Sequence, residues 1–324
     1  MNPTQWQPTA SVDNLKRRAE VLAQIRQFFA RRGVMEVDTP VMSHCAVSDP
    51  FIDTIETAYR PHFQAEAQVL YLQTSPEYAM KRLLAAGSGP IYQMAKAFRN
   101  GEYGKRHNPE FTMLEWYRPG FDDQQLMDEV EALVSEVLGD VAISHYSYGE
   151  LFQHYLGLDP HQADARQLAA VTRQHIEIEL DDDDPDTWLN LLMSHVIEPA
   201  LASRGAVFVH DYPASQAALA KVKTGQDGTE VAARFELFVN GIELANGYHE
   251  LTDAAEQQAR LLKDQRSREQ LGLPCRPLEM RLVAALESGM PECAGVALGV
   301  DRLVMMALGT SNIRDVLAFP LNRA

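Results

Sequence analysis

The sequence predicts a protein of the α+β class, because it combines paired strands with amphipathic helices. Alternating apolar and polar residues flank two polar turns, one within residues 99–110 and one at Asn240-Gly241, and each pattern predicts an antiparallel hairpin. Apolar residues recur at helical spacing over residues 13–32 and 122–138, which predicts two long helices. The 324 residues suffice for one large domain or two small ones.

The composition is that of an ordinary globular protein, with 46% hydrophobic and 23% charged residues. The formal net charge of −16 argues against broad, non-specific binding to nucleic acid, which depends on lysine and arginine neutralising phosphates. Cys45, Cys275 and Cys293 form no paired motif, so we expect free thiols in a reducing compartment. We find no signal peptide pattern and no apolar run of about 20 residues, so we expect a cytoplasmic protein that binds no membrane.

The first element in chain order is the helix over residues 13–32, and Gly33 stands at its expected end. β-Branched residues alternate over residues 34–42 and predict a strand that runs up to Pro40. This succession of helix, strand and proline is common in protein cores, so alone it indicates little about function.

A second helix is expected after residue 75. Thr74 or Ser75 would cap it, Pro76 would take its first position, and Gly87 suits its end. Glu77 then falls in the first helical turn. A carboxylate there is favoured by the helix dipole, so Glu77 alone does not indicate a binding site.

The hairpin over residues 91–117 has two unlike faces. Large apolar residues cover one face, and the other carries Arg99, Phe111, Glu115 and Tyr117. Such a group could bind a polyanion through arginine, stack a flat ring on phenylalanine, and hold an amine with carboxylate and phenol. The alternative is a charged surface hairpin with no ligand.

The second hairpin turns at Asn240-Gly241. This turn predicts that Phe238 pairs with Glu243 and that Glu236 pairs with Ala245, so both glutamates lie on one face. A divalent cation that bridges the carboxylates and a phosphate would relieve their repulsion. The alternative is two exposed glutamates on an edge hairpin.

The C-terminal third adds helices and glycines. We expect a bulge near Gly247, and close backbone approach at Gly295 and Gly299. Asp301-Arg302 should open a final apolar helix. Further helices are expected over residues 187–201, 254–271 and 278–286, and an acidic surface loop over residues 181–184.

Three motifs in order resemble those of the class II aminoacyl-tRNA synthetases. FRN followed by RHNPEFTMLEWY, within residues 98–117, resembles motif 2 in its lysyl-tRNA synthetase form. The helix and strand before Pro40 resemble motif 1, and GVALGVDRLVM at residues 295–305 resembles motif 3. The resemblance implies a catalytic domain over residues 13–324 after a tail at residues 1–12, built as an antiparallel sheet flanked by helices. Motif 1 implies a homodimer.

The resemblance implies a reaction that joins an amino-acid carboxylate to the α-phosphate of ATP. Arg99 would hold both groups, Phe111 and Arg302 would sandwich the adenine, and Arg99 and Arg302 are the expected catalytic residues. Glu236 and Glu243 match glutamates that hold Mg²⁺ with ATP in that family. The expected ATP contacts are Arg99, Asn100, Gly101, Arg106, His107, Asn108, Phe111, Glu243, Leu244, Gly299 and Arg302.

The same resemblance implies an amino-acid pocket. Glu250 matches the glutamate that receives the ammonium of the lysine side chain, and Glu77 and Glu115 would add two carboxylates. Three carboxylates select a substrate with two amines, which indicates lysine or an isomer. The expected pocket residues are Ser75, Glu77, Glu115, Tyr117, Asn246, Glu250 and Ala297.

Departures from the lysyl-tRNA synthetases indicate the acceptor. The helix at residue 13 leaves no room for their N-terminal anticodon-binding OB domain, and with the net charge of −16 we expect no stable tRNA binding. Ala297 stands where those synthetases have glycine. Both features resemble the lysyl-tRNA synthetase-like ligases that attach (R)-β-lysine to a lysine of elongation factor P. Gly101 departs from the glutamate usual at its position, so Glu102 or backbone could replace a contact to adenine.

Two alternatives remain open from the sequence. A lysyl-tRNA synthetase that works from a bare catalytic domain would charge tRNA. A catalytically silent relative would bind only amino acids or a partner protein. The complete set of Arg99, Glu236, Glu243 and Arg302 argues against a silent protein.

Overall fold

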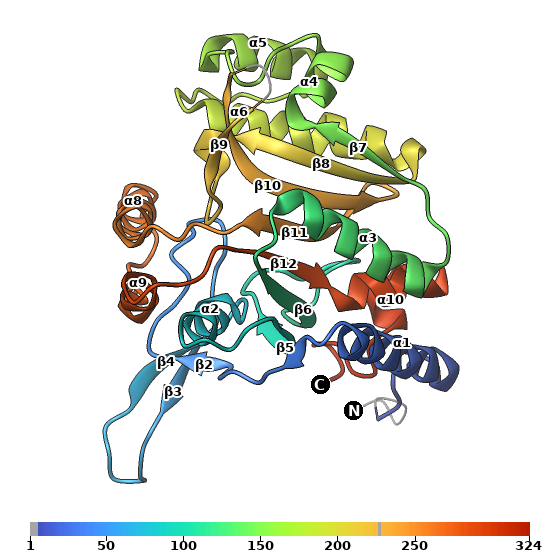
Figure 1. Cartoon of the computed structure of the whole chain (residues 1–324), viewed down its shortest axis with the longest axis vertical. Coiled ribbons are helices and arrows are strands. Elements are labelled where there is room, and N and C mark those ends of the chain that lie inside the picture. The colour runs from blue at the N-terminus through green and yellow to red at the C-terminus, as the bar shows by residue number, and fades with distance from the viewer. Residues whose placement is uncertain (1–5, 226–227) are drawn as a thin grey trace.

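A mixed, mainly antiparallel sheet forms the centre of the molecule (Figure 1), which is a computed structural model that describes residues 6–225 and 228–324. Neighbouring strands are antiparallel except at the two edges, where β1 pairs with β5 and β7 pairs with β8 in parallel. The nine strands found in the described residues are, in spatial order, β1 (Met35–Glu36), β5 (Ile91–Phe98), β6 (Glu110–Pro119), β12 (Cys293–Gly299), β11 (Ile242–His249), β10 (Glu230–Val239), β8 (Ala206–Pro213) and β7 (Ile143–Ser147), with β9 (Val222–Thr224) beside β10.

Both predicted hairpins are present. β5 and β6 pair antiparallel, with Gln93 opposite Glu115. β10 and β11 join at Asn240-Gly241, where both residues have positive φ (52° and 71°), as a two-residue turn of this kind requires. The predicted pairing of Phe238 with Glu243 is confirmed.

The predicted pairing of Glu236 with Ala245 is wrong, because Glu236 pairs with Asn246. Leu244 is an extra residue in β11, so the register shifts between Leu237 and Phe238. The bulge therefore lies at Leu244 and not near Gly247. Gly247 has another role, since a Cβ there would lie 2.3 Å from the Phe235 ring.

Three helices pack together against one side of the sheet. They are α1 (Val12–Arg31), α3 (Asp123–Leu138) and α10 (Val300–Leu308), at the right of Figure 1. Asp122 forms a capping box with Gln125 at the start of α3, as such residues favour. The Phe29 ring of α1 stacks on Tyr92 of β5 at 4.3 Å between centroids, so the apolar face predicted for this helix is in the core.

A second group of helices contains α2 (Glu77–Ala85), α8 (Ala254–Gln270) and α9 (Met280–Glu287), at the left of Figure 1. Pro76 lies at the N-cap of α2, not at its first position as predicted, and the Ser75 hydroxyl accepts a hydrogen bond from the Glu77 amide at 3.0 Å. This hydroxyl fixes the backbone on which Glu77 begins the helix.

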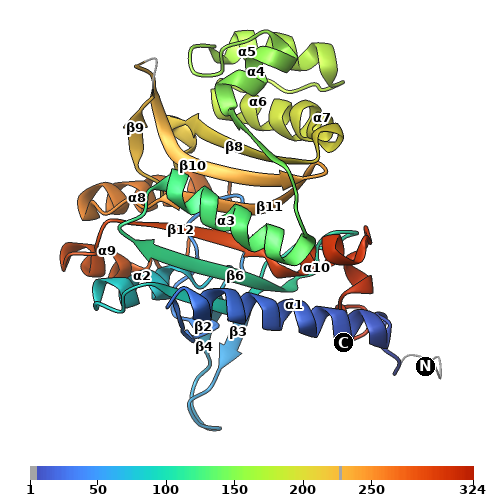
Figure 2. The same cartoon turned by 45° about the vertical axis from the view of Figure 1, so that its right-hand side comes forward.

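The predicted helix over residues 187–201 is part of a small helical layer over β7 and β8, at the top of Figure 2. Its helices are α4 (Tyr148–Leu156), α5 (Ala165–His175), α6 (Pro185–Leu192), a π-helical turn (Met193–Ile197) and α7 (Glu198–Leu201). Trp188 and Phe152 are fully buried in the core between this layer and the sheet. Short 3₁₀ turns occur at Ala202–Arg204, Ala214–Gln216 and Ile313–Asp315.

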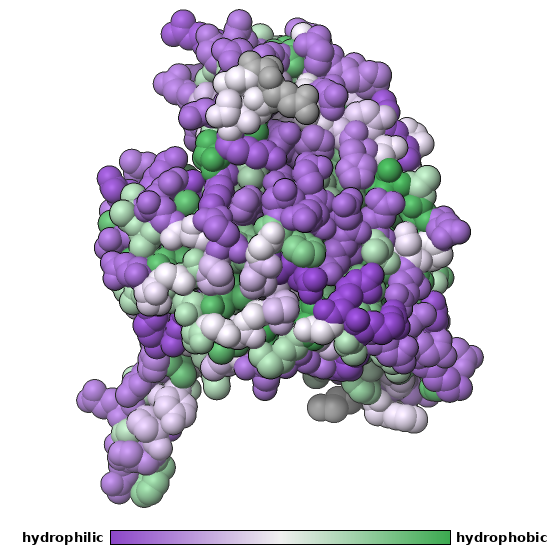
Figure 3. All heavy atoms as spheres, in the orientation of Figure 1, coloured by the Kyte–Doolittle hydropathy of each residue, from purple (hydrophilic) through white to green (hydrophobic). Residues whose placement is uncertain are grey.

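A separate sheet of three strands, β2 (Met42–Ser43), β4 (Gln68–Leu72) and β3 (Glu56–Tyr59), projects as an arm at the bottom of Figures 1 and 2. Hydrophilic residues predominate on the face in Figure 3, and apolar residues occur there in small groups. Residues 1–5 of the predicted tail lie outside the described part, but Thr9 and Ala10 pair with the C-terminal Leu317 and Ala318. Within the described residues, no helix combines the length and apolar character needed to cross a membrane.

Candidate active site

A cavity of about 400 Å³ lies where β6, β11 and β12 meet the motif 2 loop and the start of α2. Most of the predicted site residues line it, although they come from segments far apart in the sequence. Those that line it are Ser75, Glu77, Arg99, Arg106, His107, Asn108, Phe111, Glu115, Tyr117, Glu243, Leu244, Asn246, Glu250, Ala297, Gly299 and Arg302. Asn100, Gly101 and Glu236 lie outside the lining as described.

Carboxylates gather at one part of the cavity. Glu115 of β6 is almost fully buried, and its two oxygens accept hydrogen bonds from the hydroxyls of Ser75 at 2.7 Å and Tyr117 at 2.6 Å. Burial, reinforced by the charge of Glu77, raises the pKa of Glu115 to about 7. Burial also raises the pKa of Glu250 to about 8, although the charge of Lys81 opposes the rise.

Lys81 was not predicted as a member of this group. It lies on α2, only 1% exposed, and its Nζ atom is 2.6 Å from carboxylate oxygens of both Glu77 and Glu250. Gly295 makes space for the cluster, because a Cβ there would lie 2.5 Å from Glu250 and 2.3 Å from Tyr117. The spacing of Glu77 and Lys81, four residues apart on a helix, was the one available sequence signal.

Arg99 faces the cavity at the end of β5. Its guanidinium carbon lies 5.3 Å from the centre of the Phe111 ring, and its Nη1 atom lies 3.6 Å from a carboxylate oxygen of Glu102. The Nε atom of Arg99 is buried and finds no hydrogen-bond partner among the residues the structure describes. A buried donor of this kind is suited to an anionic ligand.

Glu102 and Gly101 show how the departure in motif 2 is accommodated. Gly101 has φ +78°, a conformation that disfavours any residue with a Cβ. Glu102, the next residue, lines the cavity and lies beside Arg99. Glu102 is therefore placed to contact a ligand in the cavity.

Arg302 opens α10 and reaches across to β11. Its Nη1 atom donates to the Glu243 carbonyl at 2.7 Å, and its Nη2 atom lies 2.7 Å from His107 Nε2. Burial and the charge of Arg302 lower the pKa of His107, so the neutral imidazole accepts this hydrogen bond. The side chain of the neighbouring Asp301 accepts from the Thr112 amide and pairs with Arg18 at 2.6 Å, which ties α10 to β6 and α1.

The residues predicted to bind the phosphates differ in how exposed they are and in whether their side chains already have hydrogen-bond partners. Arg106 and His107 are exposed on the motif 2 loop, although the His107 ring is bonded to Arg302 and partly covered by its neighbours. The Asn108 amide is instead occupied by backbone groups, because it donates to Glu110 at 2.6 Å and accepts from Leu321 at 3.0 Å. Asn108 therefore fixes the loop against the C-terminal segment.

Glu236 and Glu243, the predicted metal ligands, lie in different surroundings. Glu243 lines the cavity and is 44% exposed, with Arg302 3.5 Å away. Glu236 lies behind it in an ion pair with Arg234 and accepts from Asn246 Nδ2 at 3.3 Å. The described part of the chain contains no ready-made group of three His, Cys, Asp or Glu side chains for a metal.

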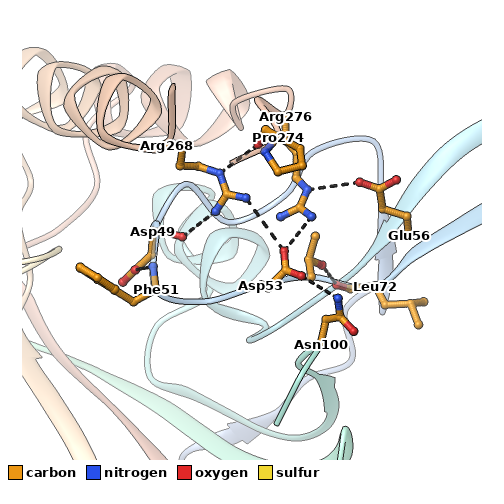
Figure 4. Close-up of polar contacts among 10 residues, drawn as sticks. Asp49, Phe51, Asp53, Glu56, Leu72, Asn100, Arg268, Pro274 and Arg276 are labelled. Carbon is orange, nitrogen blue, oxygen red and sulfur yellow. Dashed lines mark hydrogen bonds and ion pairs between the residues drawn. The ribbon is translucent and has the colours of Figure 1, made fainter. Parts of the chain in front are cut away.

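Asn100, which does not line the cavity, belongs to a cluster of residues around Asp53, which we call the Asp53 cluster (Figure 4). Asn100 donates to Asp53 at 2.6 Å, and Arg276 pairs with the same carboxylate at 2.7 Å. Arg268 is almost fully buried and donates to the Asp49 carbonyl at 3.0 Å. Burial would raise the pKa of Asp53, but the hydrogen bonds from Asn100 and Arg276 outweigh it and lower that pKa.

Comparison with known proteins agrees with this fold. The family model of the class II tRNA synthetases (D, K and N) matches residues 5–323, and the chain therefore belongs to the class II tRNA synthetase family. The predicted fold class is confirmed.

Within this family, three curated relatives that are similar over nearly their full length carry one name, elongation factor P–(R)-β-lysine ligase. The ligase of Vibrio cholerae is 51% identical over 326 residues, which cover 100% of both chains. The ligase of Hamiltonella defensa is 50% identical over 321 residues, or 98% of each chain. The ligase of Haemophilus ducreyi is 49% identical over 319 residues, or 98% of this chain and 97% of the relative.

Proposed function

We propose that this chain is an ATP-dependent ligase that transfers (R)-β-lysine to a lysine side chain of translation elongation factor P. In the first step a carboxylate oxygen of β-lysine attacks the α-phosphorus of ATP, and the bond to pyrophosphate breaks. In the second step the neutral amine of the acceptor lysine attacks the acyl carbon of the adenylate. An amide forms, AMP leaves, and the amine gives up a proton.

The observation that carries the proposal is that one cavity is lined by a group of negatively charged side chains and a group of positively charged side chains. Glu77, Glu115 and Glu250 supply carboxylates for a substrate with two ammonium groups. Arg99 and Arg302 supply cations for its carboxylate and for ATP. These are the two binding functions that an amino-acid-activating enzyme requires.

The proposed role of Arg99 follows from its unpaired donor. Charge moves onto the leaving pyrophosphate as the new bond forms, and a guanidinium held beside Phe111 stabilises that charge without having to reorient. Arg302 and Phe111 are proposed to hold the adenine between them, with Glu102 contacting its polar edge. Asn246 has a buried Oδ1 without a hydrogen-bond partner in the described chain, so we assign it to an ammonium group of the substrate.

Mg²⁺ is proposed to bind with ATP at Glu243. Mg²⁺ commonly takes one or two carboxylates, substrate phosphates and water, so a group of three protein ligands is not needed. Glu243 fits this description because it is half exposed within the cavity. Glu236 fits less well, since it would have to leave Arg234 to reach the ion. When bound, the ion would offset phosphate charge.

Elongation factor P is the proposed acceptor because the names of the full-length relatives describe them as ligases for elongation factor P and (R)-β-lysine. The net charge of −16 also disfavours tRNA, whose binding depends on cations that neutralise phosphates. We further propose that the enzyme acts in the cytoplasm as a homodimer. Charging of tRNA remains the competing outcome of the transfer test.

The first step is tested by exchange of labelled pyrophosphate into ATP, with Mg²⁺ and (R)-β-lysine. We expect exchange with (R)-β-lysine and weaker exchange with α-lysine, because Ala297 narrows the pocket. Arg99→Ala should lower the rate about 100-fold, since one donor to a developing charge is typically worth that much. Absence of exchange with either diamine would contradict the proposed activation step and favour a silent protein.

A further inference from the structure

Among the residues that the structure describes, Lys81 is the one buried cation that pairs with this group of carboxylates, and the reaction as proposed does not use it. Burying an ammonium costs free energy unless carboxylates surround it. Its Nζ atom is 2.6 Å from Glu77 and 2.6 Å from Glu250, which come from α2 and from the end of β11. Lys81 is 1% exposed and does not line the cavity as described, so it cannot act as a substrate contact.

The charge of the pocket follows from these neighbours. Glu77, Glu115 and Glu250 carry three carboxylates, and Lys81 carries one ammonium, so two negative charges remain when all are ionised. A substrate with two ammonium groups neutralises the pocket. A substrate with one ammonium group leaves a buried carboxylate unpaired, which is costly.

We propose that Lys81 is a fixed counter-ion that sets the pocket at two uncompensated negative charges and so selects substrates with two ammonium groups. This inference rests on the proposed function and deepens it, because it assigns the substrate class to a charge balance. Lys81 acts through Glu77 and Glu250 and is therefore a positioning residue.

The other ionisable groups around the cluster do not change this balance. Burial raises the pKa of each neighbouring phenol and thiol, and the nearby carboxylates raise it further, so these groups stay neutral near pH 7. They are Tyr78 of α2, Tyr117 of β6, Tyr248 of β11 and Cys293 of β12. Arg234 lies behind Tyr248 and is matched by Glu236. The buried α9 residues packed against α2, Leu282 and Leu286, are apolar, and Arg281 of α9 pairs with Glu279.

The proposal predicts how many protons leave when the substrate binds. Without Lys81, the repulsion among the three carboxylates would hold about one more proton in the free pocket at pH 7. Two entering ammonium groups would expel it only at the cost of leaving the third carboxylate without a cation. Lys81→Met should therefore release about one more proton per (R)-β-lysine bound than the wild type. Its affinity at pH 7 should fall about tenfold, because that proton must first be removed.

Two further variants keep the test valid if Lys81→Met fails to fold. Glu77→Gln keeps the counter-ion with one carboxylate fewer, so it should release fewer protons than the wild type. Lys81→Met combined with Glu77→Gln restores two uncompensated charges, so its proton release should return close to the wild-type number. Thermal unfolding of each variant checks that it is folded before titration.

The experiment is titration calorimetry of the full chain with (R)-β-lysine and with α-lysine, in buffers of different ionisation heat. If Lys81 only stabilises the fold, Lys81→Met will lower the melting temperature and leave the proton number unchanged, and the proposal is overturned. If the wild type binds neither diamine, both the proposal for Lys81 and the proposed function are overturned. If the diamines bind with the predicted proton numbers but nothing is transferred to elongation factor P, only the proposed acceptor fails.

Discussion

Glu115 and Glu250 make the binding of the amino acid depend on pH. Burial raises their pKa values to about 7 and about 8, so both carry protons for part of the time near neutral pH. Only the ionised carboxylates attract ammonium groups, and they ionise as the pH rises. We therefore expect the KM for (R)-β-lysine to fall about tenfold between pH 6 and pH 8.5.

The measurement is pyrophosphate exchange at saturating ATP across this pH range. Glu250→Gln is the matched variant, because it removes the group with the higher pKa and should flatten the upper part of the profile. A KM that stays constant, or that rises with pH below 8.5, would contradict the assignment of these carboxyls to the ammonium groups.

At the scale of single residues, the sequence identified which residues belong to the site better than it identified which residues contact one another. Nearly all residues that the motifs indicated line the cavity. They did not show that Lys81 pairs with Glu250, because those residues are far apart in the chain and meet only when α2 packs near the end of β11. They also did not show that Asn108 is occupied by Glu110 and Leu321.

Among the structural elements, the Asp53 cluster holds the start of the motif 2 loop. Asn100 follows Arg99 directly, and its bond to Asp53 connects that loop to Arg276 and to the segment between α8 and α9. Asp53→Asn should loosen this connection and misplace Arg99. We expect kcat/KM for ATP to fall about tenfold, with a much smaller change in the affinity for β-lysine, because displacing a catalytic group is costly.

Glu56→Gln is the matched control for this prediction. Glu56 also pairs with Arg276, at 3.4 Å, but it makes no contact with Asn100 in the described structure. The control should keep near wild-type kinetics in the exchange assay. If kcat/KM for ATP fell equally in both variants, the charge of the cluster would be what matters, and the hydrogen bond to Asn100 would not.

The elements themselves were predicted well where local rules decide them. The turn at Asn240-Gly241 and the helix predicted over residues 122–138 follow from their own residues. The register of β11 beyond the turn was wrong by one residue, because a bulge at Leu244 has no local signature. That bulge brings Asn246 opposite Glu236, where the two side chains bond.

For the whole molecule, the proposed homodimer predicts a mass of twice 36.2 kDa in solution. Met35 and Met42, in and near the strand of motif 1, are 48% and 47% exposed, and covering apolar surface of this kind favours association. Met35→Asp should produce monomers with reduced exchange activity. Light scattering after size exclusion measures the mass, and a wild-type monomer with full activity would contradict the proposed assembly.

The measurement that tests the account most directly is transfer to the acceptor. Purified protein, ATP, Mg²⁺ and labelled (R)-β-lysine are offered elongation factor P in one reaction and total tRNA in another, with α-lysine as a parallel set. We predict label on elongation factor P, with β-lysine preferred over α-lysine, and none on tRNA. Label on tRNA and none on elongation factor P would contradict the account and identify a minimal lysyl-tRNA synthetase.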